Sequence, residues 1–152
     1  MRNREGAVLV AWASKNGNTA NLAQRILEVL EGRGLSVDLL PVTRVDWSRL
    51  EGWSALVFGS PTYGSGDLHP DWDRPERQLR DVDLKGWPAA VFGCGSPRYI
   101  TPWWAVDILE NRLKNGGARL VVPSYKADTL EGLRVRDADP WIEALAEALL
   151  AL

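Results

Sequence analysis

Three apolar runs, at residues 7–13, 54–59 and 88–93, constrain the fold of this chain more than any other feature of its sequence. Each run is closed by a serine or a glycine and lacks the polar alternation of a half-exposed strand. Such runs predict strands that are buried on both faces of a parallel sheet. Between them lie stretches with apolar residues at helical spacing, such as Leu22 and Ile26. This alternation predicts a doubly wound α/β fold with helices on both faces of the sheet.

Two further apolar runs, at 35–42 and 118–122, bring the expected parallel sheet to five strands. Parallel strands of such a sheet are joined by right-handed crossovers. Helices are expected from Thr19 to Gly32, over 46–51, over 76–82, around 106–113, and from a capping Asp139 with Pro140 in the first position. The segments 60–75 and 126–138 are expected to be largely irregular.

The composition narrows the class of protein. A length of 152 residues with 45% apolar residues suits a single globular domain over residues 1–152. A net charge of −2 argues against partners such as nucleic acids or anionic membranes, and no apolar run approaches the roughly 20 residues of a membrane-spanning helix. Cys94 is the only cysteine and His69 the only histidine, so we expect neither an intrachain disulfide nor a metal site, and we expect a reducing, cytoplasmic compartment.

The loop that follows the first run is suited to an anion. Its residues are Ser14, Lys15, Asn16, Gly17, Asn18 and Thr19. A strand, a polar loop and a helix start in this order direct hydroxyls and backbone N–H groups, together with the positive end of the helix dipole, at one point. The spacing is neither that of a nucleoside-triphosphatase loop nor that of a dinucleotide-binding loop. The alternative is an ordinary strand-to-helix turn with a capping side chain.

Two more loops leave the carboxyl ends of strands with unusual residues. One contains Pro61, Thr62, Tyr63, Gly64 and Ser65, and the other contains Cys94, Gly95, Ser96 and Tyr99. Ligands of doubly wound sheets bind at this edge of the sheet. Two aromatic residues beside flexible glycines predict a slot for a flat ring, and the loop at 14–19 would anchor a phosphate on its tail. This favours a phosphorylated flavin, whereas either tyrosine alone is equally typical of an ordinary surface residue.

Taken together, the three loops resemble those of short-chain flavodoxins, and the resemblance extends over essentially the whole chain. It rests on four stretches, namely 14–19, 60–64, 92–99 and 105–118, and on the lack of an inserted loop in the fifth strand. The resemblance implies the strand order 2-1-3-4-5 and a small electron carrier with non-covalently bound FMN. Such a protein passes single electrons between a reductase and an acceptor through a stabilised neutral semiquinone.

The resemblance also implies roles for individual residues. Ser14, Asn16, Gly17, Asn18 and Thr19 would bind the phosphate. One wall of the ring site would consist of Thr62, Tyr63 and Gly64. The other wall would consist of Gly95, Ser96 and Tyr99. The Gly64–Ser65 peptide would turn its carbonyl toward the protonated flavin N5. We expect the Lys15 side chain to point into solvent, and we expect Cys94 to be a packing residue because no histidine lies near it in the sequence.

Several departures from the family pattern affect the redox potential. Ser65 and Ser96 stand where acidic residues are common in the family, and Arg98 stands beside Tyr99. Weaker repulsion of the anionic hydroquinone predicts a semiquinone/hydroquinone potential that is less negative than is usual for the family. An acidic patch of Asp67, Asp71, Asp73 and Glu76 would steer basic partners, although a solvated surface is an equally good interpretation.

Three other functions remain open at this stage. An NAD(P)H-dependent quinone or flavin reductase has the same fold but needs a nicotinamide site or an oligomer interface, and no segment of this chain is an obvious candidate. A flavodoxin-like module of a larger reductase complex is also compatible, whereas a flavin-free binding domain fits poorly with three intact loops. We expect a monomer. Whether Trp72, Trp103 or Trp104 contacts the flavin is left open by the sequence.

Overall fold

The computed structural model describes residues 2–63, with only the backbone of Tyr63, and residues 67–152. Its core is a parallel sheet in the order β2-β1-β3-β5-β6. The strands of this path are β1 (Val8–Trp12), β2 (Val37–Pro41), β3 (Ala55–Tyr63), β5 (Pro88–Gly95) and β6 (Arg119–Leu120). In the centre, Val10 lies beside Leu39 of β2 and Val57 of β3. The predicted order is confirmed, with β5 as the fourth strand.

The fifth position of the sheet is shared by two short strands. β6 pairs with the first residues of β5, and β7 (Tyr125–Asp128) pairs with its last residues, from Phe92 to Gly95. We expected one strand over 118–122 and an irregular segment from residue 126, and the second part of that prediction is wrong. Pro123 lies between the two strands and has no backbone N–H to donate to the ladder, which accounts for the interruption.

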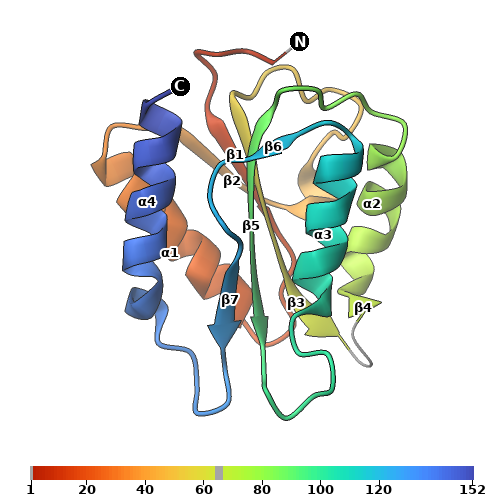
Figure 1. The fold of residues 1–152 in the computed structure, drawn as a ribbon, viewed down its shortest axis with the longest axis vertical. Coiled ribbons are helices and arrows are strands. Elements are labelled where there is room, and N and C mark those ends of the chain that lie inside the picture. Colours follow the sequence, from red (N-terminus) through yellow and green to blue (C-terminus); the bar gives the residue numbers. More distant parts are fainter. Residues whose placement is uncertain (1, 64–66) are drawn as a thin grey trace.

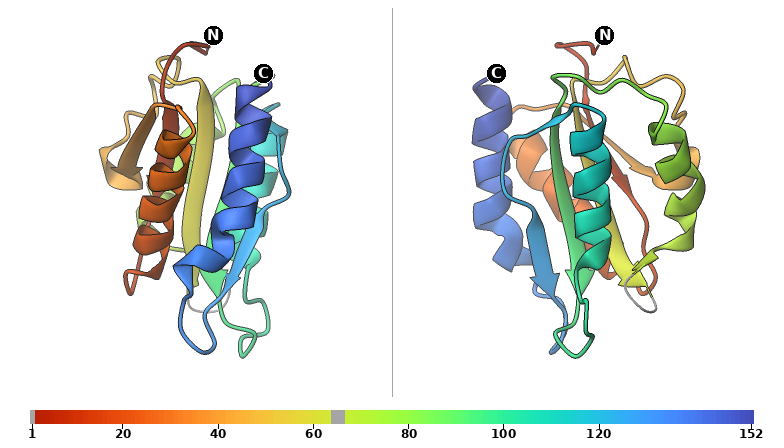
Figure 2. Two further views of the ribbon diagram at one scale, coloured as in Figure 1. Left: turned by 90° about the vertical axis from the view of Figure 1, so that its left-hand side faces the viewer. Right: turned by 45° about the vertical axis from the view of Figure 1, so that its right-hand side comes forward.

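Helices cover both faces of the sheet (Figure 1), and Figure 2 shows the same arrangement from two other sides. α1 (Asn18–Gly32) and α4 (Asp139–Leu150) pack on one face, and α2 (Asp73–Leu79) and α3 (Trp104–Asn115) pack on the other. Alternate residues of β1 serve the two layers: Val8 and Val10 belong to the core under α1 and α4, and Leu9 and Ala11 to the core under α2 and α3. This confirms strands that are buried on both faces.

The segment after the third strand is more regular than predicted. β3 runs on to Tyr63 and forms an antiparallel hairpin with β4 (Asp67–Leu68), in which Thr62 lies opposite Leu68. A 3₁₀ turn, η2 (Pro70–Trp72), leads directly into α2, which therefore begins and ends three residues before the predicted helix over 76–82. The expected irregular segment 60–75 is thus a strand end, a hairpin and a helix start.

Two other local predictions are wrong for the same physical reason. No helix forms over 46–51; a 3₁₀ turn, η1 (Val42–Arg44), is followed by a turn in which Asp46 accepts hydrogen bonds from the Ser48 N–H and hydroxyl. Asp139 does not cap α4 but is its first residue, and its carboxylate binds Arg25 at 2.9 and 2.8 Å. In both places the Asp carboxylate accepts hydrogen bonds from other groups and not from the backbone N–H groups of a helix start.

Trp72 belongs to the core. Its side chain is wholly buried, its ring lies 5.5 Å from that of Trp47 and 5.2 Å from that of Phe58, and its indole N–H donates to Gly59 O at 3.0 Å. Trp47 and Trp87 are buried as well, whereas Trp104 is half exposed. The packing of Trp72 removes it from the residues that could reach a ligand.

Candidate functional site

The three loops meet at the carboxyl ends of the strands, at the lower end of the molecule in Figure 1. They surround one cavity of about 230 Å³. Its lining consists of Ser14, Lys15, Asn16, Asn18, Thr19, Pro61, Thr62, Cys94, Gly95, Ser96, Tyr99 and Thr129. The structure thus brings together eleven of the fifteen expected site residues and adds Thr129. Of the other four, Gly17 lies in the first loop, and Tyr63 lies in the second with its side chain outside the described residues, as all of Gly64 and Ser65 are.

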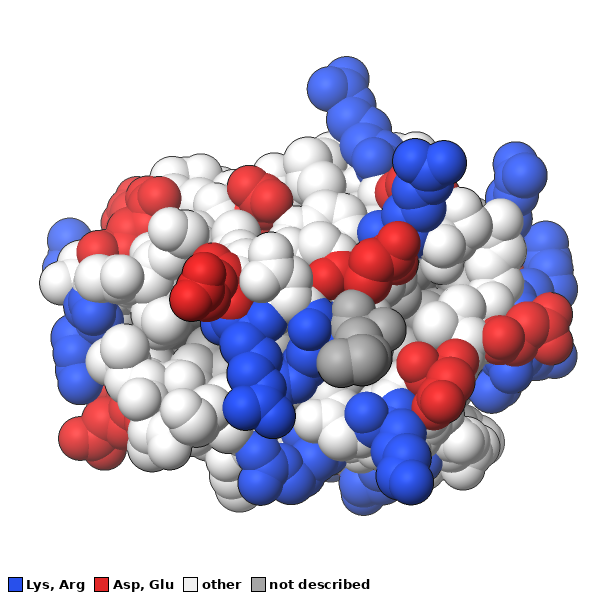
Figure 3. Space-filling model, turned by 90° about the horizontal axis from the view of Figure 1, so that it is seen from above, with Lys and Arg blue, Asp and Glu red and all other residues white. Residues whose placement is uncertain are grey.

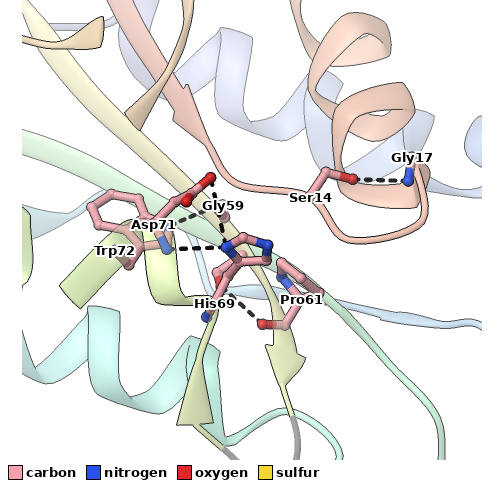
Figure 4. A network of polar contacts seen from close by, with 8 residues as sticks. Ser14, Gly17, Gly59, Pro61, His69, Asp71 and Trp72 are labelled. Carbon is pink, nitrogen blue, oxygen red and sulfur yellow. Dashed lines mark hydrogen bonds and ion pairs between the residues drawn. The ribbon is translucent and has the colours of Figure 1, made fainter. Parts of the chain in front are cut away.

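The first loop has the shape of an anion-binding helix start. Gly17 precedes α1 with a φ of 85°, a left-handed conformation that side chains of L-residues rarely adopt. Ser14 Oγ accepts the Gly17 N–H at 3.0 Å, as Figure 4 shows. The amides that open α1 have no acceptor within the helix. Lys15 and Asn16 are exposed at the rim of the cavity.

Thr19 is the most unusual residue of the cavity. Its side chain is buried, and among the described residues no group forms a hydrogen bond of regular geometry with Thr19 Oγ1. Its neighbour is the thiol of Cys94, a weak partner, whose pKa is raised to about 11 by burial. A buried hydroxyl without a good partner is costly. An anion with several acceptor oxygens would satisfy it, so the loop fits a phosphate group.

The second loop is held by a network around Ser60 and His69 (Figure 4). The buried Ser60 hydroxyl donates to Pro61 O at 2.8 Å and accepts the His69 N–H at 3.3 Å. His69 Nδ1 accepts the Asp71 N–H at 3.1 Å and so caps η2. His69 therefore has a structural role in the hairpin. The Gly64–Ser65 peptide and the Tyr63 ring stay predictions because they lie outside the described residues.

Thr62 makes a contact that the sequence did not indicate. Its hydroxyl oxygen accepts the Ala105 N–H at 3.4 Å, at the start of α3. The hydroxyl therefore joins the second loop to the helix that follows the third loop, while the residue also lines the cavity.

The third loop begins at a glycine that no other residue can replace without rearrangement. A Cβ on Gly95 would lie 1.8 Å from Pro102 O, because the loop returns across its own start. Ser96 is half-buried, and Tyr99 and Ile100 at the tip are 60% and 100% exposed. An open ring at the rim of a cavity leaves room for a flat ligand beside it.

Thr129 is the cavity residue that sequence reasoning missed. It follows β7, in the stretch that we expected to be irregular, and both its N–H and its hydroxyl donate to Gly95 O, at 2.9 and 3.1 Å. The available signal was the short stretch Tyr125–Asp128 after Pro123, which is too short to be recognised as a strand from its pattern.

The expected acidic patch is only partly present. Asp67, Asp71 and Asp73 are exposed, but Glu76 is buried and binds Arg80 and Arg112 at 2.9 Å each. A carboxylate between two guanidinium groups contributes no net negative field. Its inclusion in the patch is therefore wrong.

The end of the sheet opposite the cavity carries charges of both signs. Figure 3 shows acidic and basic side chains interspersed over this end. Desolvation and the charges of Arg4 and Arg119 lower the pKa of Arg2, so the three arginines lie close together. Arg2 and Arg4 also border a cavity of about 290 Å³. The sequence alone shows no such basic group because Arg119 is remote in the chain.

The part of the chain that the structure describes has neither a metal site nor a membrane-spanning helix. No group of three or more His, Cys, Asp or Glu residues there is arranged to hold a metal ion. Nor does any described helix have the length and apolar character needed to cross a membrane.

Comparison with known proteins gives a consistent result. Residues 10–144 match the flavodoxin family model. A flavodoxin of Maridesulfovibrio salexigens is 34% identical over 123 residues, which make up 79% of this chain and 84% of the relative, and one of Nitratidesulfovibrio vulgaris is 31% identical over 145 residues, or 93% and 98% of the two chains. The crystal structure of oxidised flavodoxin 1 from Bacillus cereus is similar with a TM-score of 0.86 at 26% identity, covering 96% of this chain and 98% of that one.

Proposed function

This chain belongs to the flavodoxin family and is a small FMN-binding electron carrier, and we propose that it passes single electrons between a reductase and an acceptor through a stabilised neutral semiquinone. The observation that carries the proposal is the convergence of three loops on one cavity, with the buried Thr19 hydroxyl, whose neighbour is only the weakly bonding Cys94 thiol, at the end where α1 begins. The bound flavin supplies the one-electron chemistry, and the protein sets where the ring lies and what surrounds it.

The phosphate end of FMN belongs at the first loop. We assign its oxygens to the Ser14 and Thr19 hydroxyls, the Asn16 side chain and the N–H groups of Gly17 and Asn18. The left-handed Gly17 and the free amides of the first turn of α1 support this assignment. Lys15 is exposed at the rim of the cavity.

The ring end belongs between the second and third loops. Thr62 and Tyr63 are assigned to one wall, with the Gly64–Ser65 peptide beside flavin N5, and Gly95, Ser96 and Tyr99 are assigned to the other. The close packing of Gly95 under Pro102 and the open position of Tyr99 support a slot of this kind. Cys94 lies below the slot as a protonated, buried thiol, in keeping with a packing role.

Partner proteins would meet the flavin at the exposed apolar rim. Tyr99, Ile100 and Trp104 are each at least half exposed, and Leu130 in the neighbouring loop is 42% exposed. Single apolar residues of this kind next to a redox group suit brief contacts with a reductase and an acceptor. We propose that the carrier works as a monomer in the cytoplasm.

The charges near this rim bear on the redox potential. Ser96 is half-buried in the cavity wall, and Arg98 beside Tyr99 is exposed. These features support a semiquinone/hydroquinone potential that is less negative than the family usually shows. A potentiometric titration of the FMN-loaded chain tests this, and a very low second potential would contradict it.

The test of the function is FMN titration of the purified chain followed by slow photoreduction. We expect uptake of FMN and a transient long-wavelength absorption of the neutral semiquinone. Reduction in a single two-electron step, or bleaching of the flavin by NADPH alone, would instead indicate a reductase. Failure to bind FMN would refute the proposal.

A further inference from the structure

Three hydrogen bonds join the base of the third loop to the end of β7. Thr129 donates to Gly95 O twice, from its N–H at 2.9 Å and from its hydroxyl at 3.1 Å. Trp103 Nε1 donates to Ala127 O at 3.0 Å. We propose that Trp103 and Thr129 are positioning residues that fix the loop carrying Ser96 and Tyr99 relative to the flavin ring. The inference rests on the proposed function, since it concerns the ring end of the same site.

The bonds close the loop at both of its ends. Gly95 is where the chain leaves β5, and Trp103 is the last residue before α3. The chain returns so closely that Pro102 O lies 1.8 Å, and Trp103 Cδ1 3.1 Å, from the position of a Cβ on Gly95. We call this group of contacts, made by Gly95, Trp103, Ala127 and Thr129, the clasp.

The clasp is anchored in the sheet. β7 pairs with β5 up to Gly95 opposite Asp128, and Ala127 is buried. The two bonds from Thr129 extend that pairing by one residue, beyond the end of the ladder. The β7 side of the clasp therefore moves only if the sheet edge itself moves.

The tip of the loop, from Ser96 to Ile100, is shaped by bonds within the loop itself. Tyr99 N–H donates to Ser96 O at 3.1 Å and Arg98 N–H to Ser96 Oγ at 3.3 Å, so these bonds shape the tip without tying it to the sheet. Tyr99 and Ile100 are largely exposed. The clasp therefore fixes the two ends of the loop from which Tyr99 projects.

The clasp is a property of the side chains and not only of the backbone. Its Trp103 bond needs an indole N–H, and one of its two Thr129 bonds needs a hydroxyl, so Trp103→Phe and Thr129→Val each remove one donor while nearly keeping the shape. Loosening the ring wall should weaken every flavin alike, with or without a phosphate. Loss of a phosphate contact would weaken FMN alone.

The experiment measures dissociation constants of FMN and riboflavin for the full chain and its variants, with amide hydrogen exchange of the flavin-free proteins. For Trp103→Phe and Thr129→Val we expect about three- to tenfold weaker binding of both flavins, an unchanged FMN-to-riboflavin ratio, and faster exchange of the Thr129 amide. Thr129→Ser, which keeps the hydroxyl, should bind both flavins within about twofold of the original chain. Trp53→Phe is the matched control, because it removes an indole donor to Asp38 outside the cavity, and it should stay within the same limits.

The outcomes separate this inference from the proposed function. Faster Thr129 exchange with unchanged flavin affinity would show that the clasp is merely structural and would overturn the inference. Unchanged Thr129 amide exchange together with unchanged flavin affinity would overturn it as well, because the bonds would then not restrict the loop. Failure of the unaltered chain to bind FMN would refute the proposed function itself.

Discussion

Replacing Thr19 with Val should stabilise the flavin-free protein and weaken the binding of FMN. The change exchanges a buried hydroxyl for a methyl group of nearly the same shape. Among the described residues Thr19 Oγ1 has no hydrogen bond of regular geometry, so the substitution removes a desolvated polar group without breaking a good bond. Thr and Val are both β-branched and have similar helix propensities, so the first turn of α1 should change little.

The magnitudes follow from the cost of an unsatisfied hydroxyl and from the strength of a bond to a phosphate. An unpaired buried hydroxyl costs about 1–3 kcal/mol, so the flavin-free variant should gain roughly 1 kcal/mol and melt about 2–4 °C higher. A hydrogen bond to a charged group contributes about 1.5–3 kcal/mol. FMN should therefore bind roughly 10- to 100-fold more weakly, whereas riboflavin, which lacks the phosphate, should bind with nearly unchanged affinity.

The assays are thermal or urea unfolding without flavin and flavin titration followed by fluorescence. Thr62→Val is the matched control, because the Thr62 hydroxyl accepts the Ala105 N–H and its loss should destabilise the flavin-free protein. A flavin-free Thr19→Val protein that is less stable than the original, or one that keeps its full FMN affinity, would refute the reasoning.

Three further predictions concern charge and burial. Burial raises the Cys94 pKa from 9.0 to about 11, so its contribution to stability is fully present below pH 9. About 3 kcal/mol of the free energy of unfolding should be lost as the pH rises from about 9 to 11. In urea unfolding, the free energy of unfolding of Cys94→Ala should depend less on pH over this range, and an identical pH dependence would contradict this. Glu76→Gln should lower the free energy of unfolding by about 2–3 kcal/mol, because a neutral amide cannot balance two guanidinium groups. Arg80→Ala, which removes the exposed partner, should lower it by less than about 1 kcal/mol. Equal effects of the two substitutions in urea unfolding would refute this distinction. Hydrogen bonding to Arg25 lowers the Asp139 pKa, so this bond should stabilise the fold above about pH 4 and lose its effect as the pH falls below that. In Asp139→Asn the free energy of unfolding, measured between pH 2.5 and 7, should therefore fall less at acidic pH.

The strands and the first loop were predictable from the sequence because their signals are local. The apolar runs at 7–13, 54–59 and 88–93 form β1, β3 and β5. A strand without polar alternation has no polar face for solvent, so it is stable where both of its faces are buried. The turn before α1 was recognisable from Gly17 among polar residues. Its left-handed backbone is a property of glycine itself.

Two of the errors arose where a partner remote in the sequence decides the local structure. Asp139 had the pattern of a helix cap, but Arg25, 114 positions away, binds its carboxylate. Glu76 had the pattern of a surface acid, but Arg112 of α3 binds it in the interior. No window of sequence around either acid contains this information.

The sequence by itself determined the α/β order of elements, the anion-binding start of α1 and the family, because hydrophobic periodicity and short motifs depend on neighbours in the chain. Only the tertiary structure decided which groups share the cavity and in what state. The Thr19 hydroxyl is buried with only the weakly bonding Cys94 thiol as its neighbour, because the two residues meet across the packed core. The clasp depends on β7 reaching Gly95 after the interruption at Pro123. Burial and hydrogen bonding are set by distances across the sheet, and separation along the chain does not determine those distances.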